Sequence, residues 1–207
     1  MPTKNNQLAF FLHASAEVAS GNIEQLLLKN GSDKRGIYIP VKWNSAPQTN
    51  EDSITVFVPT DSYDQDHLNE KQIHNLKGIY IKPPGAGLCK ILESQGGSSF
   101  LNVRIQQFIE ILPILLTKIT GFAEFVNVRL SQNTLMVEIE KSIFEATCLE
   151  TDKQPLTHKQ VGCLLSSAVA CALVKVTGEP VVILSEIRDL QSKTTKIDYR
   201  VMVKMQD

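Results

Sequence analysis

Nucleophilic catalysis requires a serine or cysteine with a histidine base and an orienting carboxylate within reach. The chain offers Ser166 and Cys163, and His158 stands about one helical turn before them. His158, however, falls at the start of the predicted helix, and the chain has no GxSxG turn that would expose a nucleophilic serine. We therefore predict no acyl-transfer site, and more generally no catalytic residue.

The thiols and imidazoles are the next groups that could do chemistry. The four cysteines form no CxxC pair and the four histidines are scattered, whereas a zinc site calls for close pairs of ligands. Cys163 and Cys171 fall in an apolar, small-residue stretch, where a free cysteine behaves as a small buried hydrophobe. We predict that both are buried and unpaired, and that the chain holds no metal and no cofactor.

A glycine-rich segment, Lys82-Pro-Pro-Gly-Ala-Gly87, follows a predicted strand and opens a predicted helix, as phosphate-binding loops do. It lacks the lysine and hydroxyl of a GxxxxGK[ST] loop, and its two prolines remove two N–H donors. A tight structural turn is the favoured interpretation. Anion binding by the backbone of Gly85, Ala86 and Gly87 is the alternative.

The bulk composition excludes several classes of protein. The formal net charge is -1 and no cluster of lysines and arginines occurs, so a general nucleic-acid binder is not expected. The apolar run Leu8 to Leu12 is too short for a signal peptide. The longest later run, Ile111 to Leu116, contains Pro113 and is far below the ~20 residues that span a bilayer. We predict no transmembrane segment, and reduced cysteines in a cytoplasmic compartment.

The elements of the N-terminal half are short. Helices are predicted at 7–19 and 23–29, separated by Ser20-Gly21-Asn22, with Gly31 as the terminator. Strands rich in β-branched and aromatic residues are predicted at 36–43, 54–58 and 77–82, and a helix at 88–94. Residues 45–53 read as a loop, and 61–76 as a loop with a surface helix. We predict that residues 1–97 form a packed extension or a small subdomain.

Residues 98–207 show the clearest pattern. A long helix at 99–120, capped by Ser98 or Ser99 and kinked at Pro113, precedes a hairpin of 126–130 and 135–139. A connector at 142–156 leads to a helix at 157–177 and to strands at 181–187 and 195–204. This helix–hairpin–helix–hairpin domain predicts an α+β fold: one four-stranded antiparallel sheet with both helices on one face.

Two segments repeat within this domain. Leu116-Thr-Lys-Ile-Thr-Gly121 and Leu173-Val-Lys-Val-Thr-Gly178 are 57 residues apart, and each ends a predicted helix before a hairpin. A duplicated unit would explain the match. The alternative is that helix ends converge on lysine and glycine, because a cation suits the carbonyl end and glycine suits the left-handed position.

The predicted helix 157–177 carries two rows of small residues, Gly162-Ser166-Ala170 and Cys163-Ser167-Cys171. Small side chains let a neighbour approach a helix closely, so the rows suit tight core packing or, alternatively, a binding surface. We take Gly162, Cys163, Ser166, Ser167 and Ala170 as candidate ligand or interface residues.

The order of elements from Val126 to Met205 resembles one known group, the transport-protein-particle (TRAPP) vesicle-tethering subunits and the related 4-vinyl-reductase-type ligand-binding domains. The resemblance lies in Val161-Gly-Cys-Leu-Leu-Ser-Ser-Ala-Val-Ala-Cys-Ala-Leu followed by Gly178-Glu-Pro-Val-Val. It covers about the last 80 residues. The cysteine-bearing end of the vinyl-reductase-type domains is absent, since Ile187, Arg188 and Asp189 follow Glu186. The resemblance implies a non-catalytic module that dimerises and holds an apolar ligand or a partner.

Two functional classes remain. The first is a non-catalytic ligand-binding or protein-interaction module that self-associates, with a second copy, another protein or an apolar small molecule as its partner. The alternative is a small-molecule enzyme whose site is assembled from loops without a linear motif. A dry apolar cleft would favour the first class, and convergent polar groups with shifted pKa values would favour the second.

Overall fold

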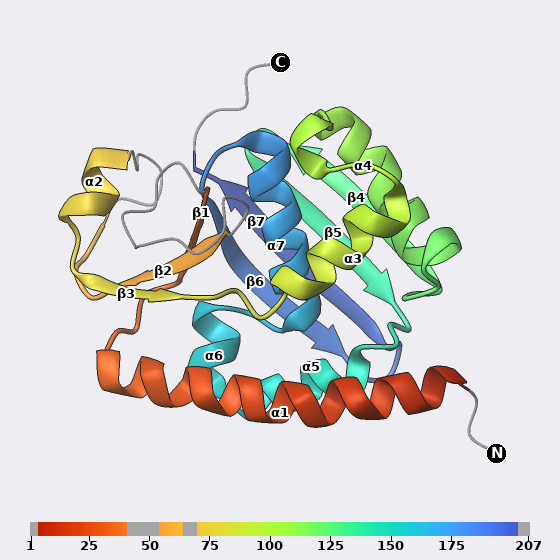
Figure 1. The fold of residues 1–207 in the computed structure, drawn as a ribbon, viewed down its shortest axis with the longest axis horizontal. Helices are drawn as coiled ribbons and strands as arrows, with labels where there is room; N and C mark the ends of the chain where they lie inside the picture. Colours follow the sequence, from red (N-terminus) through yellow and green to blue (C-terminus); the bar gives the residue numbers. More distant parts are fainter. Residues whose placement is uncertain (1–3, 41–53, 64–69, 203–207) are drawn as a thin grey trace.

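The computed structural model describes residues 4–40, 54–63 and 70–202 of the chain, so the predicted loop at 45–53 lies outside the described residues. Its centre is a sheet of seven strands in the order β3-β2-β1-β6-β7-β5-β4, in which each pair of neighbours is antiparallel (Figure 1). The strands are β1 (Ile37–Ile39), β2 (Thr55–Pro59), β3 (Gly78–Ile81), β4 (Phe125–Ser131), β5 (Thr134–Glu140), β6 (Val181–Asp189) and β7 (Thr194–Val201).

The predicted α+β class holds, and the two predicted hairpins share one sheet because β5 pairs with β7. The predicted four-stranded sheet is corrected to seven strands. The first part of β6 is apolar on both faces and pairs on its other edge with β1, where Ile37 lies opposite Val182. The N-terminal strands therefore continue the same sheet. A domain boundary between residues 97 and 98 stays a prediction.

The helices lie mainly on one face of this sheet. They are α1 (Lys4–Asn30), α2 (Glu70–Asn75), α3 (Ala86–Gly96), α4 (Ile105–Ile114), α5 (Glu145–Asp152), α6 (Pro155–Gln160) and α7 (Leu164–Thr177), with a 3₁₀-helix η2 (Phe100–Asn102) and a π-helix η3 (Leu115–Ile119). Figure 1 shows α7, α3 and α4 in front of the strands, and α1 running along one end of the molecule beside α5 and α6.

Successive side chains of a strand point to opposite faces of the sheet, so the hydrophobic core has two parts, one on each face. On β2, Val56 and Val58 face the main core under α7, whereas Phe57 joins a smaller cluster with Ile73 of α2. The sheet is therefore covered on both faces near β1 to β3. At the β4 end of the sheet, side chains on the face away from the helices, such as Met136, are exposed.

Two predicted helices at the N-terminus are in fact one. Helix α1 continues through Ser20-Gly21-Asn22, because its contacts with α5 and α6 outweigh the cost of about 1 kcal/mol for a glycine inside a helix. Its predicted end at Gly31 is confirmed by the left-handed backbone there, with φ of 68°.

The predicted helix 157–177 is, by contrast, broken into α6 and α7. Gly162 between them has a left-handed backbone with φ of 78°. A β-carbon there would lie 2.6 Å from Oγ of Ser166 and 2.7 Å from Cδ1 of Ile183, so only glycine fits.

The segment Pro155–Thr177 is long and apolar enough to cross a membrane: an 18-residue window within it has a mean hydropathy of 1.6, but 78% of that window is buried inside the fold. A core helix passes the same test, and the predicted absence of a transmembrane segment stays a prediction.

Two further differences concern helical segments. The predicted helix 99–120 is divided into η2, α4 and η3, and the π-helix begins at Leu115, two residues after the predicted kink at Pro113. Ser99 caps η2 by accepting a hydrogen bond from the backbone N–H of Leu101.

The predicted connector 142–156 contains α5. The buried face of this helix, Thr147, Cys148 and Thr151, is too polar to give an apolar stripe in the sequence.

Candidate functional site

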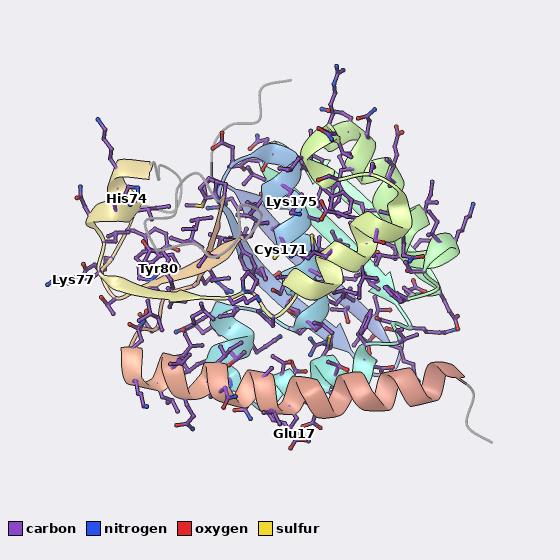
Figure 2. All side chains as sticks on the ribbon, in the orientation of Figure 1. Glu17, His74, Lys77, Tyr80, Cys171 and Lys175 are labelled. Carbon is purple, nitrogen blue, oxygen red and sulfur yellow. The ribbon has the colours of Figure 1, made fainter. Side chains whose placement is uncertain are left out.

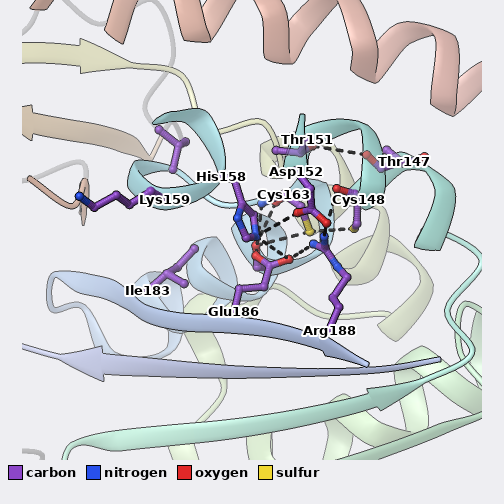
Figure 3. A network of polar contacts seen from close by, with 12 residues as sticks. Thr147, Cys148, Thr151, Asp152, His158, Lys159, Cys163, Ile183, Glu186 and Arg188 are labelled. Atoms are coloured by element: carbon purple, nitrogen blue, oxygen red, sulfur yellow. Dashed lines mark hydrogen bonds and ion pairs between the residues drawn. The ribbon is translucent and has the colours of Figure 1, made fainter. Parts of the chain in front are cut away.

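The described residues contain one dense group of ionisable and sulfur-bearing side chains, which we call the Cys148–Glu186 cluster (Figure 3). Its members come from four places in the fold: α5, α6, the turn before α7, and β6. They are Cys148, Asp152, His158, Cys163, Glu186 and Arg188. Elements far apart in the chain thus meet where α5 and α6 cover the sheet.

A β-bulge aims the two β6 members of the cluster at the helices. The register of β6 against β7 shifts between Ile183 and Ser185, so that the inward-facing positions become Ile183, Glu186 and Arg188. Strict alternation from Ile183 would have turned Glu186 and Arg188 away from the helices. The extra residue therefore places two charges under α5 and α6, as bulges do elsewhere when they redirect side chains.

Helix α6, which carries His158, is fastened at its start by Glu24 of α1. The carboxylate of Glu24 accepts hydrogen bonds from the backbone N–H groups of Leu156 and Thr157, at 3.2 and 2.7 Å, and from Oγ1 of Thr157 at 2.9 Å. These contacts satisfy donors that a helix start leaves open. They hold α6, and so the imidazole of His158, over the inner face of β6.

The two thiols of the cluster are in direct contact. Cys148 donates toward Cys163 with the Sγ atoms 2.7 Å apart, and all four cysteines of the chain are free and buried. The shared hydrogen bond and burial raise the pKa of Cys148 well above its usual value. The predicted burial of Cys163 and Cys171 is confirmed, but Cys163 has a neighbouring thiol that the sequence analysis did not pair with it.

The ion pairs of the cluster neutralise its buried charges. Arg188 donates to the carboxylates of Glu186 and Asp152 and, at 3.2 Å, to the backbone oxygen of Cys148. Burial would raise the pKa of Glu186, but His158 and Arg188 outweigh burial and lower it to about 2. The same carboxylate raises the pKa of His158. The network ties α5 and α6 to β6.

The cluster also presents a set of metal-binding atoms. The Sγ atoms of Cys148 and Cys163 and a carboxylate oxygen of Glu186 all lie within 4.8 Å of one another. The side chain of Glu186 is 2% exposed, and those of His158 and Asp152, at 26% and 34%, form the rim. The two sulfurs and Glu186 are therefore buried, whereas His158 and Asp152 reach the surface.

A second feature lies on the opposite face of the sheet, where no helix of the described residues covers β4, β5, β7 and β6. A groove of about 300 Å³ runs across these strands, and we call it the sheet-face groove. Its exposed apolar side chains are Met136 on β5 and Ile187 on β6, which are 41% and 65% exposed. Its charged side chains are Arg129, Glu138, Lys196 and Asp198.

The candidate residues on α7 are inside the fold. Ser166, Ser167 and Ala170 are fully buried within this chain. Ser166 donates from Oγ to the backbone oxygen of Cys163 at 3.2 Å and accepts at its own backbone oxygen from the hydroxyl of Tyr199 at 3.1 Å. The small rows thus serve tight internal packing, and a ligand or interface role for Gly162, Cys163, Ser166, Ser167 and Ala170 stays a prediction.

The glycine-rich turn at 82–87 contacts the row of small residues that contains Ser167. The N–H of Gly85 donates to Oγ of Ser167 at 2.9 Å, and that of Ala86 to the backbone oxygen of Pro83 at 3.1 Å. Two of the three candidate anion donors are therefore occupied by the protein itself. This favours the structural turn, and anion binding by Gly85, Ala86 and Gly87 stays a prediction.

Sequence reasoning missed the Cys148–Glu186 cluster because its members are spread over 41 positions, from Cys148 to Arg188. No short spacing links them. The one available signal was the pair Glu186 and Arg188, two charges of opposite sign two residues apart in a strand whose first residues are wholly apolar. The bulge that turns them inward has no sequence signature that we used.

No protein-family model matches the chain, and no curated protein matches it. Among solved structures, the chain is similar to a trafficking protein particle complex subunit 3 from Naegleria fowleri, which was crystallised covalently bound to palmitic acid. The sequence identity is 13% and the TM-score is 0.37, and the match covers 59% of this chain and 76% of that chain. A TRAPP subunit is thus a distant structural neighbour of this protein, and a likeness to 4-vinyl-reductase-type domains stays a prediction.

Proposed function

We propose that this protein is a non-catalytic binding module that associates with a second copy of itself through the sheet-face groove. The observation that supports the proposal is the uncovered end of the sheet, where Met136 and Ile187 are exposed between charged side chains. At the other end of the same face, the side chains of β1 and β2 are covered by α2.

The charges of the groove favour a second copy as the occupant. The groove carries two cations, Arg129 and Lys196, and two anions, Glu138 and Asp198. In a two-fold dimer the same patch faces itself, so a patch of balanced and mixed charge can match its own copy. A strongly acidic or basic partner would call for a patch of the opposite sign.

The residue types agree with an interface. Methionine, phenylalanine and arginine are enriched in protein interfaces, where an apolar centre is surrounded by a polar rim. Phe125 is 48% exposed and lies two residues before Asn127, on the same face of β4 as the groove. A stable interface buries about 800 Å² per partner, so the contact would extend from the groove to Phe125.

The proposal places the interface on the sheet and not on α7, because the small residues of α7 are buried against this chain's own strands and turn. The Cys148–Glu186 cluster favours a module over a loop-assembled enzyme, since its charges are paired and enclosed. Four free cysteines fit a cytoplasmic location, which is part of the proposal.

The test is the mass of the full chain in solution, measured by light scattering after size exclusion and by native mass spectrometry over a range of concentrations. The expected wild-type species is a dimer, and Met136→Asp and Ile187→Asp should be monomers with unchanged circular dichroism. Leu101→Asp is the matched control, because Leu101 is 60% exposed outside the groove. A monomeric wild type, or dimers of both groove variants, would overturn the proposal, as would an apolar molecule bound to a monomer.

A further inference from the structure

The Cys148–Glu186 cluster combines the atom types that borderline-soft metal ions select. Zinc is held by cysteine sulfur, histidine nitrogen and carboxylate oxygen, usually by four ligands. Cys148, Cys163 and Glu186 supply two sulfurs and an oxygen within 4.8 Å of one another. Ligands around one zinc ion lie roughly 3–4 Å apart, so the sulfurs, now 2.7 Å apart, would separate slightly to admit an ion.

A fourth candidate donor borders this group, although it is not among the atoms that lie within 4.8 Å of one another. Nε2 of His158 is buried at the edge of the cluster, where it forms ion pairs with two carboxylates. It lies 3.6 Å from Oε1 of Glu186 and 3.3 Å from Oδ1 of Asp152. A neutral imidazole is a common metal ligand. This nitrogen is therefore the candidate for a fourth ligand of the cluster.

The carboxylate of Glu186 can serve an ion without losing its present partner. Oε1 accepts from Arg188, whereas Oε2 accepts from the backbone N–H of Cys163 at 3.5 Å, and Ser166 is a further hydrogen-bond partner of this carboxylate. The ion pairs described for Glu186 involve Oε1, which leaves Oε2 as the oxygen for an ion. Arg188 would stay on the other oxygen and orient the ligand, as outer partners do in metal sites.

The charges also balance. A divalent ion displaces the protons of two thiols, so that two thiolates and one carboxylate carry three negative charges. The ion supplies two positive charges and Arg188 supplies the third. Asp152 lies at the rim and keeps its contact with Arg188. A buried site with no net charge avoids the large cost of an unpaired buried charge.

We propose that Cys148, Cys163, Glu186 and His158 form a closed structural site for a thiophilic divalent cation of the zinc class. The site would join α5, α6 and the start of α7 to β6. Four protein donors without a bound water are the character of structural rather than catalytic zinc sites. The proposal is independent of self-association, because the cluster and the sheet-face groove lie on opposite faces of the sheet.

The experiment uses the full chain purified under reducing conditions, with metal content measured by elemental analysis and native mass spectrometry. We expect about one zinc ion per chain, and cobalt loaded in its place should show sulfur-to-metal charge-transfer absorption. Cys148→Ser and Cys163→Ser should reduce the bound metal to near zero. Cys89→Ser and Cys171→Ser are matched controls, since both thiols are buried and free but outside the cluster.

If the serine variants fail to fold, X-ray absorption spectroscopy of the wild type decides the question. Zinc–sulfur distances of about 2.3 Å would show that cysteine sulfurs bind the metal. Wild-type protein that binds no zinc when it is added in excess would overturn the proposal. Metal bound without sulfur ligands, or metal retained by both Cys148→Ser and Cys163→Ser, would also overturn it.

Discussion

The backbone N–H of Gly85 donates a hydrogen bond of 2.9 Å to Oγ of Ser167, and at this point the turn before α3 touches the backbone of α7. A β-carbon on Gly85 would lie 2.0 Å from the backbone nitrogen of Ala168. The small residue Ser167 and the glycine together allow two main chains to approach more closely than other side chains would permit. The contact unites a candidate loop and a candidate helix that the sequence analysis treated separately.

We predict that Gly85→Ala lowers the free energy of unfolding by at least ~1–3 kcal/mol, the usual cost of overpacking, because the added methyl group meets backbone atoms that cannot rotate away. Gly87→Ala is the matched control. Nothing lies within 4 Å of a β-carbon on Gly87, which is in the first turn of α3, so this change should be neutral or stabilising by ~0.5–1 kcal/mol. Equal stabilities of the two variants in urea denaturation would contradict the prediction.

The buried row on α7 gives a second prediction. Ser166 and Ala170 are each 0% exposed, so Ser166→Leu and Ala170→Leu should each lower the free energy of unfolding by ~1–3 kcal/mol. Gln106→Leu, at an exposed position of α4, is the control and should change stability little. Variants that fold as stably as the wild type but differ in self-association would show instead that the row is an interface.

Removing Arg188 should be more damaging than removing an exposed cation. Arg188→Met leaves the buried carboxylate of Glu186 without its permanently charged partner, and loss of such a partner costs ~3–5 kcal/mol in comparable cases. Lys141→Met breaks the ion pair with Glu124, in which Lys141 is 53% exposed, and should cost less than about 1 kcal/mol. Adding Glu186→Gln to Arg188→Met should restore part of the loss, and thermal unfolding of the four proteins measures it. No recovery in the double variant would show that the charge of Glu186 is not the cause.

A further prediction concerns acid stability and the ion pair that joins Glu93 of α3 to Lys175 of α7. Figure 2 labels Lys175 on α7. Nζ of Lys175 lies 2.6 Å from Oε2 of Glu93, whose other oxygen accepts from Ser99 and from the N–H of Phe100. Burial would raise the pKa of Glu93, but Lys175 and these hydrogen bonds outweigh burial and lower it.

Because the folded pKa of Glu93 is below its unfolded value, the carboxylate stabilises the fold above about pH 4.5. That stability is lost as the pH falls through the folded pKa. The stability difference between wild type and Glu93→Gln should therefore be largest near neutral pH and shrink below pH 4.5. Urea denaturation at several pH values measures it, and Glu124→Gln, in an exposed pair with Lys141, is the control. A difference that stays constant or grows in acid would refute the role of Glu93.

The local elements followed from the sequence because local periodicity and turn chemistry determine them. The alternation of Val126 to Ile139 predicted the β4–β5 hairpin, and Gly31, Gly121 and Gly178 ended helices in the left-handed conformation as expected. Helix ends depend on residues one turn apart, and a hairpin depends on its own turn. Such contacts can be read from neighbouring residues.

The longer contacts required the tertiary structure. The pairing of β1 with β6 joins residues almost 150 positions apart, and α5 forms although its sequence has no apolar stripe. Both are decided by packing against other elements, which outweighs local preference.

The chain by itself therefore determined that this is an α+β protein with two C-terminal hairpins in one antiparallel sheet. Only the tertiary structure brought Cys148 to Cys163 and turned Glu186 inward toward His158. The physical reason is that a bulge in β6 reverses which face each following side chain takes, and that the break at Gly162 sets the angle between α6 and α7. Neither the bulge nor the break can be recognised from the amino-acid composition or from the sequence spacing of the residues that they bring together.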